Sequence, residues 1–99
     1  MARFILSPEA AEDLREIVDF IAQENPSAAR RFLGKLRNEM ERIAASPGIG
    51  HLREDLTARQ VRFWPVGRYL IVYRSEDGPP EIARVLHGAR DVAAVLGTE

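Results

Sequence analysis

Four side chains in the second half of the sequence could take part in chemistry at a phosphate or a carboxylate. They are three arginines and one histidine, namely Arg62, Arg68, Arg84 and His87. Guanidinium groups bind phosphate and carboxylate oxygens in a bidentate manner, and histidine exchanges a proton near neutral pH. A histidine before a glycine more often has a structural role, here bonded to the backbone or to Asp91. The same side chains therefore suit either a reaction or a binding surface without chemistry.

The sequence offers little to a metal ion or a cofactor. It contains no cysteine and only two histidines, His51 and His87, which excludes thiolate catalysis and a zinc or iron–sulfur site built on cysteine. Gly48 and Gly50 do not form a phosphate-binding loop, because no Lys-Ser or Lys-Thr pair follows them. We therefore expect no cofactor and no metal site.

The location that we expect is the cytoplasm. The lack of cysteine fits a reducing compartment. The residues that open the chain contain too few consecutive apolar side chains for a signal sequence or a membrane span. We therefore expect no membrane association.

The charge of the chain is nearly balanced but unevenly distributed. Fourteen basic residues oppose fifteen acidic ones, so the net charge is -1 and the chain is not a polycation drawn to any phosphate backbone. Residues 8–24 carry six acidic residues and one arginine, a local charge of -5, whereas residues 53–74 carry five arginines and two acidic residues, a local charge of +3. We expect no direct, sequence-specific binding of nucleic acid by this chain alone.

The first half of the chain predicts a short strand and two amphipathic helices. Residues 3–6 have strand character, and Ser7-Pro8 is a typical helix start with serine as the N-cap. Apolar residues then recur with helical spacing until the helix ends near Glu24, at Leu14, Ile17, Val18 and Ile21. Asn25-Pro26 opens a second helix, which ends at Ser46-Pro47-Gly48. The short junction predicts an antiparallel helical hairpin.

The second half of the chain predicts a loop, three strands and a short helix. Residues 47–58 contain two glycines and no periodicity, which is typical of a loop. Residues 59–64, 69–74 and 81–87 are rich in β-branched and aromatic side chains, and turns rich in proline and glycine separate them. We expect these strands to pair as an antiparallel meander, followed by a final helix over residues 89–96.

These elements predict one α+β domain covering residues 1–99, in the order β-α-α-β-β-β-α. The helical hairpin should cover one face of an antiparallel sheet. In residues 59–64, one side of the strand carries Val61 and Phe63, and the other carries Arg62 and Trp64. The alternation in residues 81–87 does not assign the faces. We expect the second face of the sheet to be open and lined by arginine and aromatic side chains, which would suit binding.

Several short motifs in a fixed order resemble the ParE/RelE superfamily of toxins from bacterial type II toxin–antitoxin modules, and resemble its ParE branch most. The motifs are Leu6-Ser7-Pro8-Glu9-Ala10, Glu24-Asn25-Pro26, Ser46-Pro47-Gly48, the run VGRYLIVYR over residues 66–74 and the run VLHGARD over residues 85–91. The likeness spans nearly the whole chain. The fold that it implies has the order of elements predicted above from periodicity.

The resemblance implies one of two activities. ParE-like members bind DNA gyrase and stall it without chemistry of their own, in modules that stabilise plasmids. RelE-like members cleave messenger RNA on the ribosome, which requires cations and a proton-transfer group around the attacked phosphate. A nuclease of this kind would have to use Arg62, Arg68, Arg84 and His87. No lysine lies on the predicted strands and no tyrosine follows Tyr73, so the resemblance favours gyrase inhibition. A third alternative is an inactive toxin that acts only as an antitoxin-binding corepressor.

Both branches imply a small antitoxin as partner, here a ParD-like antitoxin whose disordered segment folds along the toxin. Amphipathic helices dock through their apolar face, and acidic segments pair with arginine. We expect the antitoxin to contact the helical hairpin and the sheet at Leu14, Ile17, Phe32, Leu36, Arg62, Trp64 and Arg74. We expect the contacts with gyrase toward the C-terminal part of the sheet and the final helix, at His87 and Arg90.

Overall fold

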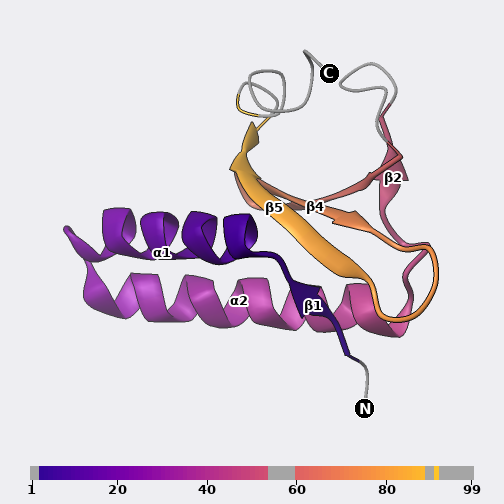
Figure 1. The fold of residues 1–99 in the computed structure, drawn as a ribbon. Coiled ribbons are helices and arrows are strands. Elements are labelled where there is room, and N and C mark those ends of the chain that lie inside the picture. Colours follow the sequence, from indigo (N-terminus) through magenta and orange to yellow (C-terminus); the bar gives the residue numbers. More distant parts are fainter. Residues whose placement is uncertain (1–2, 54–59, 89–90, 92–99) are drawn as a thin grey trace.

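Two helices pack against a five-stranded sheet in the computed structural model, which describes residues 3–53, 60–88 and 91 (Figure 1). The elements, in chain order, are β1 (Ile5–Leu6), α1 (Pro8–Ala22), α2 (Pro26–Ala45), β2 (His51–Leu52), β3 (Arg62–Val66), β4 (Tyr69–Arg74) and β5 (Glu81–His87). This arrangement confirms the predicted α+β class. Of the predicted final helix, residues 89–96, only Asp91 belongs to the described residues.

Side-chain caps begin both helices at the predicted positions. The hydroxyl of Ser7 accepts a hydrogen bond from the backbone N–H of Ala10 at 3.0 Å, and the side chain of Asn25 accepts one from Ala28 at 3.0 Å. Each cap satisfies a backbone donor that has no partner within the helix. Only three residues separate α1 from α2, so the helices form the predicted hairpin.

The sheet has the strand order β1-β5-β4-β3-β2 and is mixed. The antiparallel pairs β3–β4 and β4–β5 confirm the predicted meander. The expectation of a wholly antiparallel sheet is wrong at one edge, because β1 pairs in parallel with β5. A parallel neighbour requires a long crossover connection, which the chain between β1 and β5 provides.

The loop predicted for residues 47–58 contains a short strand, and the predicted strand over residues 59–64 is shifted. β2 pairs antiparallel with β3 at the edge of the sheet. β3 begins at Arg62 and continues through Pro65 to Val66, so the turn into β4 is made by Gly67 and Arg68. Gly67 has a φ of 59°, a conformation in which glycine is the least strained residue.

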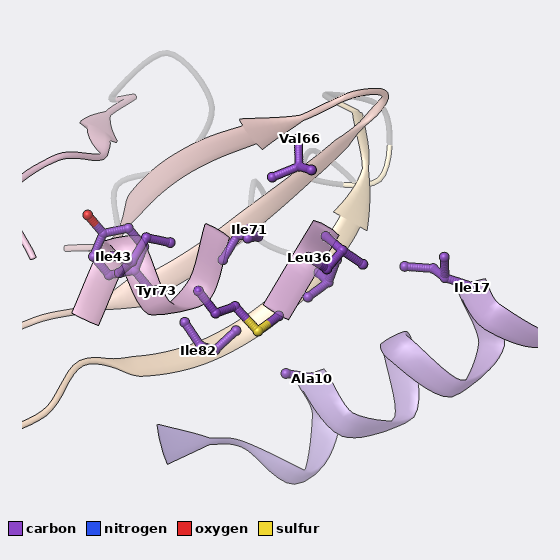
Figure 2. Packing of buried hydrophobic residues seen from close by; sticks show 10 residues of the cluster. Ala10, Ile17, Leu36, Ile43, Val66, Ile71, Tyr73 and Ile82 are labelled. Carbon is purple, nitrogen blue, oxygen red and sulfur yellow. The ribbon is translucent and has the colours of Figure 1, made fainter. Parts of the chain in front are cut away.

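The main core lies between the helices and the sheet, where the apolar stripes of both helices meet one face of β3, β4 and β5 (Figure 2). Its buried members are Ala10, Ile17, Leu36, Met40, Ile43, Val66, Ile71, Tyr73, Ile82 and Val85. Trp64 packs against the same cluster. The side of β3 that carries Trp64 therefore faces the helices, whereas the sequence analysis placed that side on the open face.

The second face of the sheet is also buried, which corrects the prediction of an open face lined by arginine. It carries a smaller apolar cluster of Val61, Phe63, Val72 and Leu86, each at most 4% exposed. The alternation predicted along this segment is right, since Val61 and Phe63 lie on the other face of the sheet from Trp64. The assignment of the two sides was wrong, because apolar residues occupy both.

A β-bulge in β5 determines where Arg84 lies. Tyr73 is paired with Ile82 and Val72 with Arg84, so Ala83 has no partner on β4. Ile82 and Val85 therefore both belong to the helix-side core although three positions separate them. A bulge re-aims the side chains next to it. Arg84, beside this bulge, reaches α1.

Candidate functional site

Arg84 is held by a carboxylate of the first helix. Its Nε and Nη2 atoms donate to the two carboxylate oxygens of Asp13 at 2.8 and 2.9 Å, and the backbone N–H of Val85 donates to Asp13 Oδ2 at 2.9 Å. The side chains of Arg84 and Asp13 are 27% and 11% exposed. The hydrogen bond to Asp13 is the main cause that raises the pKa of Arg84. This guanidinium is thus a fixed cation that anchors α1 to β5.

His87 lies at the exposed end of β5. Its backbone N–H donates to Asp91 Oδ2 at 3.1 Å, and its ring meets Tyr69 edge-on with 5.1 Å between the ring centroids. Tyr69 in turn contacts Phe32 of α2 at 5.3 Å. This bond uses the backbone N–H of His87, whereas the sequence analysis expected a structural bond of its side chain. The following Gly88 has a φ of 66°, which allows the chain to turn away from the sheet.

A cleft of about 270 Å³, named here the α1–β5 cleft, lies between the first helix and the ends of β4 and β5. It is lined by Asp13, Glu16, Ile17, Tyr69, Arg84, Val85, Leu86, His87 and Asp91. Three carboxylates face one guanidinium and one histidine, and that guanidinium is already paired. A polyanion such as RNA would meet like charge here. The cleft is better suited to a cationic or apolar side chain.

Arg62 lies at the opposite end of the sheet and fastens the chain that follows α2. Its Nη1 donates to the carbonyl oxygen of Gly50 at 2.9 Å. The hydroxyl of Tyr73 donates to the carbonyl of Pro47 at 2.6 Å and accepts from the N–H of Gly50 at 2.8 Å. Burial raises the pKa of Tyr73, while the bond from Gly50 and the charge of Arg62 act in the opposite direction. These contacts hold the chain between α2 and β2.

The four residues considered for nuclease chemistry do not all converge on one point. The strand register places Arg62 opposite Tyr73 and His87 opposite Tyr69, and these two tyrosines are four positions apart on β4, about 13 Å at the rise of a strand. Arg84 is bound to α1, as described above. Arg68 is exposed in the turn before β4, near the end that carries His87. Arg84 and His87 line the same cleft, and Arg68 lies near His87. Arg62, however, lies at the other end of the sheet, and the guanidinium of Arg84 is already bound by Asp13.

The hairpin residues predicted to contact an antitoxin divide by burial. Leu36 is fully buried and Ile17 is 8% exposed, so both serve the core and offer no contact surface in this fold. Leu14 and Phe32 are partly buried and line two separate hollows beside α2. The first, of about 140 Å³, lies beside β1, and the second, of about 370 Å³, lies beside the end of α1.

The sheet residues predicted to contact an antitoxin have partners within the chain. Trp64 is half-buried and donates through Nε1 to Glu39 Oε1 at 2.8 Å. The guanidinium of Arg42 lies 5.5 Å from the centre of its indole ring. Arg74 is exposed and pairs with Glu81 across the β4–β5 pair. Arg90, predicted to contact gyrase, lies outside the described residues.

The sequence analysis missed two of the three carboxylates of the α1–β5 cleft. It singled out Arg84, His87 and Asp91 but not Asp13 or Glu16, which line the same cleft. Asp13 and Arg84 are 71 positions apart, so no local spacing reveals their pairing. Within residues 3–53, 60–88 and 91, no cluster of side chains suits a metal ion, and no helix is long and apolar enough to cross a membrane.

The fold and these surfaces define a small α+β protein. Arg62 and Arg84 anchor its own structure, and the hollows along the helical hairpin are surfaces at which a partner could bind. The family model described as the ParE toxin of type II toxin–antitoxin systems, parDE, matches residues 4–92. The chain belongs to this family of toxins.

Curated relatives and a solved structure agree with the family assignment. The chain is 34% identical over 90 residues to Toxin RelE2 of Caulobacter vibrioides, covering 91% of this chain and 99% of that protein. It is 31% identical over 93 residues to Toxin ParE1 of Mycobacterium tuberculosis, covering 92% and 94%. A structure titled as the chromosomal ParDE system from P. aeruginosa shares the fold, with a TM-score of 0.74 at 19% identity over 89% of this chain and 97% of that one.

Proposed function

We propose that this toxin, a single domain over residues 1–99, inhibits DNA gyrase by binding it and is neutralised by a ParD-like antitoxin. The observation that carries the proposal is that its candidate nuclease cations are not available together around one phosphate. Arg62 and His87 lie at opposite ends of β4, and Arg84 is bound by Asp13. Transition-state stabilisation requires charged groups preorganised around one reacting phosphate. A binding mechanism needs no such convergence, and a toxin acting on gyrase would work in the cytoplasm.

The gyrase contact is proposed at the end of the sheet that carries His87. Arg68 and His87 are exposed there, and Tyr69 presents its ring between Phe32 and His87. Exposed arginine and aromatic side chains on rigid strands are the residues that most often dominate protein interfaces. Arg90 belongs to the same proposal.

The antitoxin contact is proposed along the helical hairpin. Leu14 and Phe32 line the two hollows that flank α2. Arg37 lies at the first hollow, and Arg31 and Lys35 lie at the second. Apolar hollows with basic rims suit an acidic amphipathic segment. A toxin–antitoxin module with such a complex would stabilise a plasmid that carries the module.

The experiment is induction of the chain in bacteria without an antitoxin, followed by three measurements. DNA breaks with intact messenger RNA are expected, together with loss of supercoiling by purified gyrase. Cleavage of ribosome-bound message would instead support the RelE-type endoribonuclease, the alternative that the name of the Caulobacter relative keeps open. Undisturbed growth would support an inactive toxin that serves as a corepressor.

The two histidines of the chain, His87 and His51, provide a test variant and its control for the role of His87. His87→Ala should reduce toxicity only in part if His87 contributes to a gyrase contact, and should abolish it if His87 transfers a proton. His51→Ala is the control, because His51 is equally a solvent-exposed histidine but lies on the edge strand β2. Complete loss of toxicity in His87→Ala, with antitoxin binding retained, would contradict the proposed function.

A further inference from the structure

The joined ends of α1 and α2 project beyond the end of the sheet (Figure 1). Phe20 lies in the last turn of α1 and is 69% exposed, the largest value among the exposed large apolar side chains of the described residues. Burying a phenylalanine stabilises a protein by about 1.5–3 kcal/mol relative to leaving it in water. At this exposure Phe20 gains little of that stabilisation within the single chain, so the gain is available to a partner that buries it.

A shallow hollow lies beside Phe20 on the same projecting hairpin. Ile21, Ala28 and Phe32 supply its apolar surface, and Arg31 and Lys35 supply its basic rim. Its volume is about 370 Å³. Arg31 and Lys35 form no ion pair with any of the described residues.

The surroundings of Phe20 carry the opposite charge. Glu16 lies four residues before it on α1, and side chains four residues apart share one side of a helix. Asp19 adjoins Phe20, and Glu24 lies in the turn that follows the helix. Asp19 and Glu24 take part in no ion pair within the described part of the chain. The hairpin end thus presents an aromatic side chain among carboxylates next to an apolar hollow among cations.

We propose that, in the chain without its antitoxin, the occupant of this hollow is Phe20 of a second copy of the same chain. The antitoxin segment proposed above for the same hollow would compete with this contact. Phe20 is not among the residues that line the hollow, so it does not fill the hollow of its own chain. A two-fold axis between two hairpin ends places each Phe20 in the hollow of the other copy. It also brings the carboxylates of each α1 to Arg31 and Lys35 of the other α2. Such an interface is isologous and closes at two copies.

The dimer is expected to be weak and sensitive to salt. The contact involves only the end of the hairpin, so its area falls at the low end for specific interfaces, where weak and transient complexes lie. The ion pairs around each Phe20 lie at the rim and are screened as ionic strength rises. This inference does not depend on gyrase or on any other target of the toxin.

Analytical ultracentrifugation of the full chain, made by cell-free synthesis to avoid its toxicity, tests the proposal. The wild-type chain should show a concentration-dependent equilibrium between monomer and dimer. Phe20→Ala should weaken the dimer by at least about 100-fold, because the side chain leaves both halves of the interface. Leu52→Ala is the matched control: Leu52 is also a large exposed apolar residue, at 52%, but lies on β2, and its loss should leave the equilibrium unchanged.

Charge exchange gives a second test that a folding defect cannot imitate. The pair of substitutions Arg31→Glu and Lys35→Glu makes both helix ends acidic, and the pair Asp19→Lys and Glu24→Lys makes both basic. Each double variant alone should be monomeric, and an equimolar mixture should form a heterodimer.

Two results would overturn the dimer. One is a wild-type chain that stays monomeric at hundreds of micromolar. The other is a monomeric chain in which Phe20→Ala weakens only the complex with an antitoxin, since the hairpin end would then belong to that interface. Failure of gyrase inhibition, by contrast, would contradict the proposed function and leave the dimer untouched.

Discussion

Asp13 is the side chain whose removal most directly tests how α1 is attached to the sheet. Its carboxylate accepts two hydrogen bonds from Arg84 and one from the backbone of Val85. Asp13→Ala leaves a half-buried guanidinium and a backbone N–H without their acceptor. Both groups are too far inside the α1–β5 contact to be fully hydrated in the folded state. The substitution therefore lowers the free energy of unfolding.

The expected loss can be estimated from the burial of the pair. Removing one partner of a fully buried ion pair costs about 3–5 kcal/mol, and an exposed pair contributes about 0–1 kcal/mol. With side chains 11% and 27% exposed, this pair lies nearer the buried limit, and we expect about 3 kcal/mol. For a domain of this size that corresponds to a fall in Tm of about 12–24 °C. Arg84→Met should cost less, about 1–2 kcal/mol, because Asp13 keeps the bond from Val85.

Urea denaturation measured by the fluorescence of Trp64 is a suitable assay, since the chain contains a single tryptophan. Glu12→Ala provides the control. It breaks the exposed ion pair between Glu12 and Arg15 on the same helix, so the midpoint should not change measurably.

An equal midpoint for Asp13→Ala and Glu12→Ala would refute the reasoning. In that case Asp13 would not hold Arg84 in solution, and Arg84 would be free to bind phosphate. The strongest argument against nuclease chemistry would be lost with it.

Three further substitutions test the packing around the two ends of the sheet. Gly50→Ala should destabilise the fold by about 1–3 kcal/mol, since the added Cβ would lie 2.6 Å from the Tyr73 hydroxyl. Gly48 has open space around it, so Gly48→Ala should be nearly neutral in the same urea titration. Tyr73→Phe should cost about 1–3 kcal/mol by leaving the Gly50 N–H and the Pro47 carbonyl without their partner. The pKa of Tyr73 is raised in the folded state. The contribution of its hydroxyl to stability is therefore complete below the ordinary value of 10.0 and is lost as pH rises through the higher folded value. The difference in unfolding free energy between wild type and Tyr73→Phe should narrow above pH 10, and a constant difference would contradict this. Ser7→Ala removes the cap of α1 and the bond to the Ala83 carbonyl at 2.8 Å, so calorimetry should show a loss of about 1–2 kcal/mol; no change in Tm would mean that water replaces both.

The local parts of the fold are the parts that the sequence predicts well. Ser7 and Asn25 cap the helices as expected, because a capping side chain acts on a backbone donor three residues away. The ends of α1 and α2 fall within two residues of the predicted positions for the same reason. The meander from β3 to β5 also follows from short turns between neighbouring strands.

The contacts that sequence reasoning missed are nonlocal. The parallel pairing of β1 with β5 joins residues 76 positions apart, and no periodicity within either segment reports it. The faces of β5 could not be assigned because the bulge at Ala83 interrupts the alternation between Ile82 and Val85. The side of β3 that faces the helices was predicted wrongly because both sides are buried, and an alternating pattern does not say which apolar side meets which layer.

The anchoring of β1 and α1 on β5 has a consequence for synthesis. The hydroxyl of Ser7 donates to the carbonyl of Ala83, the N–H of Ile5 donates to the carbonyl of Pro80, and Asp13 binds Arg84. A nascent chain in which β5 has not yet emerged therefore lacks the strand that anchors its first helix, and α1 can pack only against α2. The layered structure is completed only when residues 81–87 have left the exit tunnel, so an antitoxin that recognises the finished surface acts after that point.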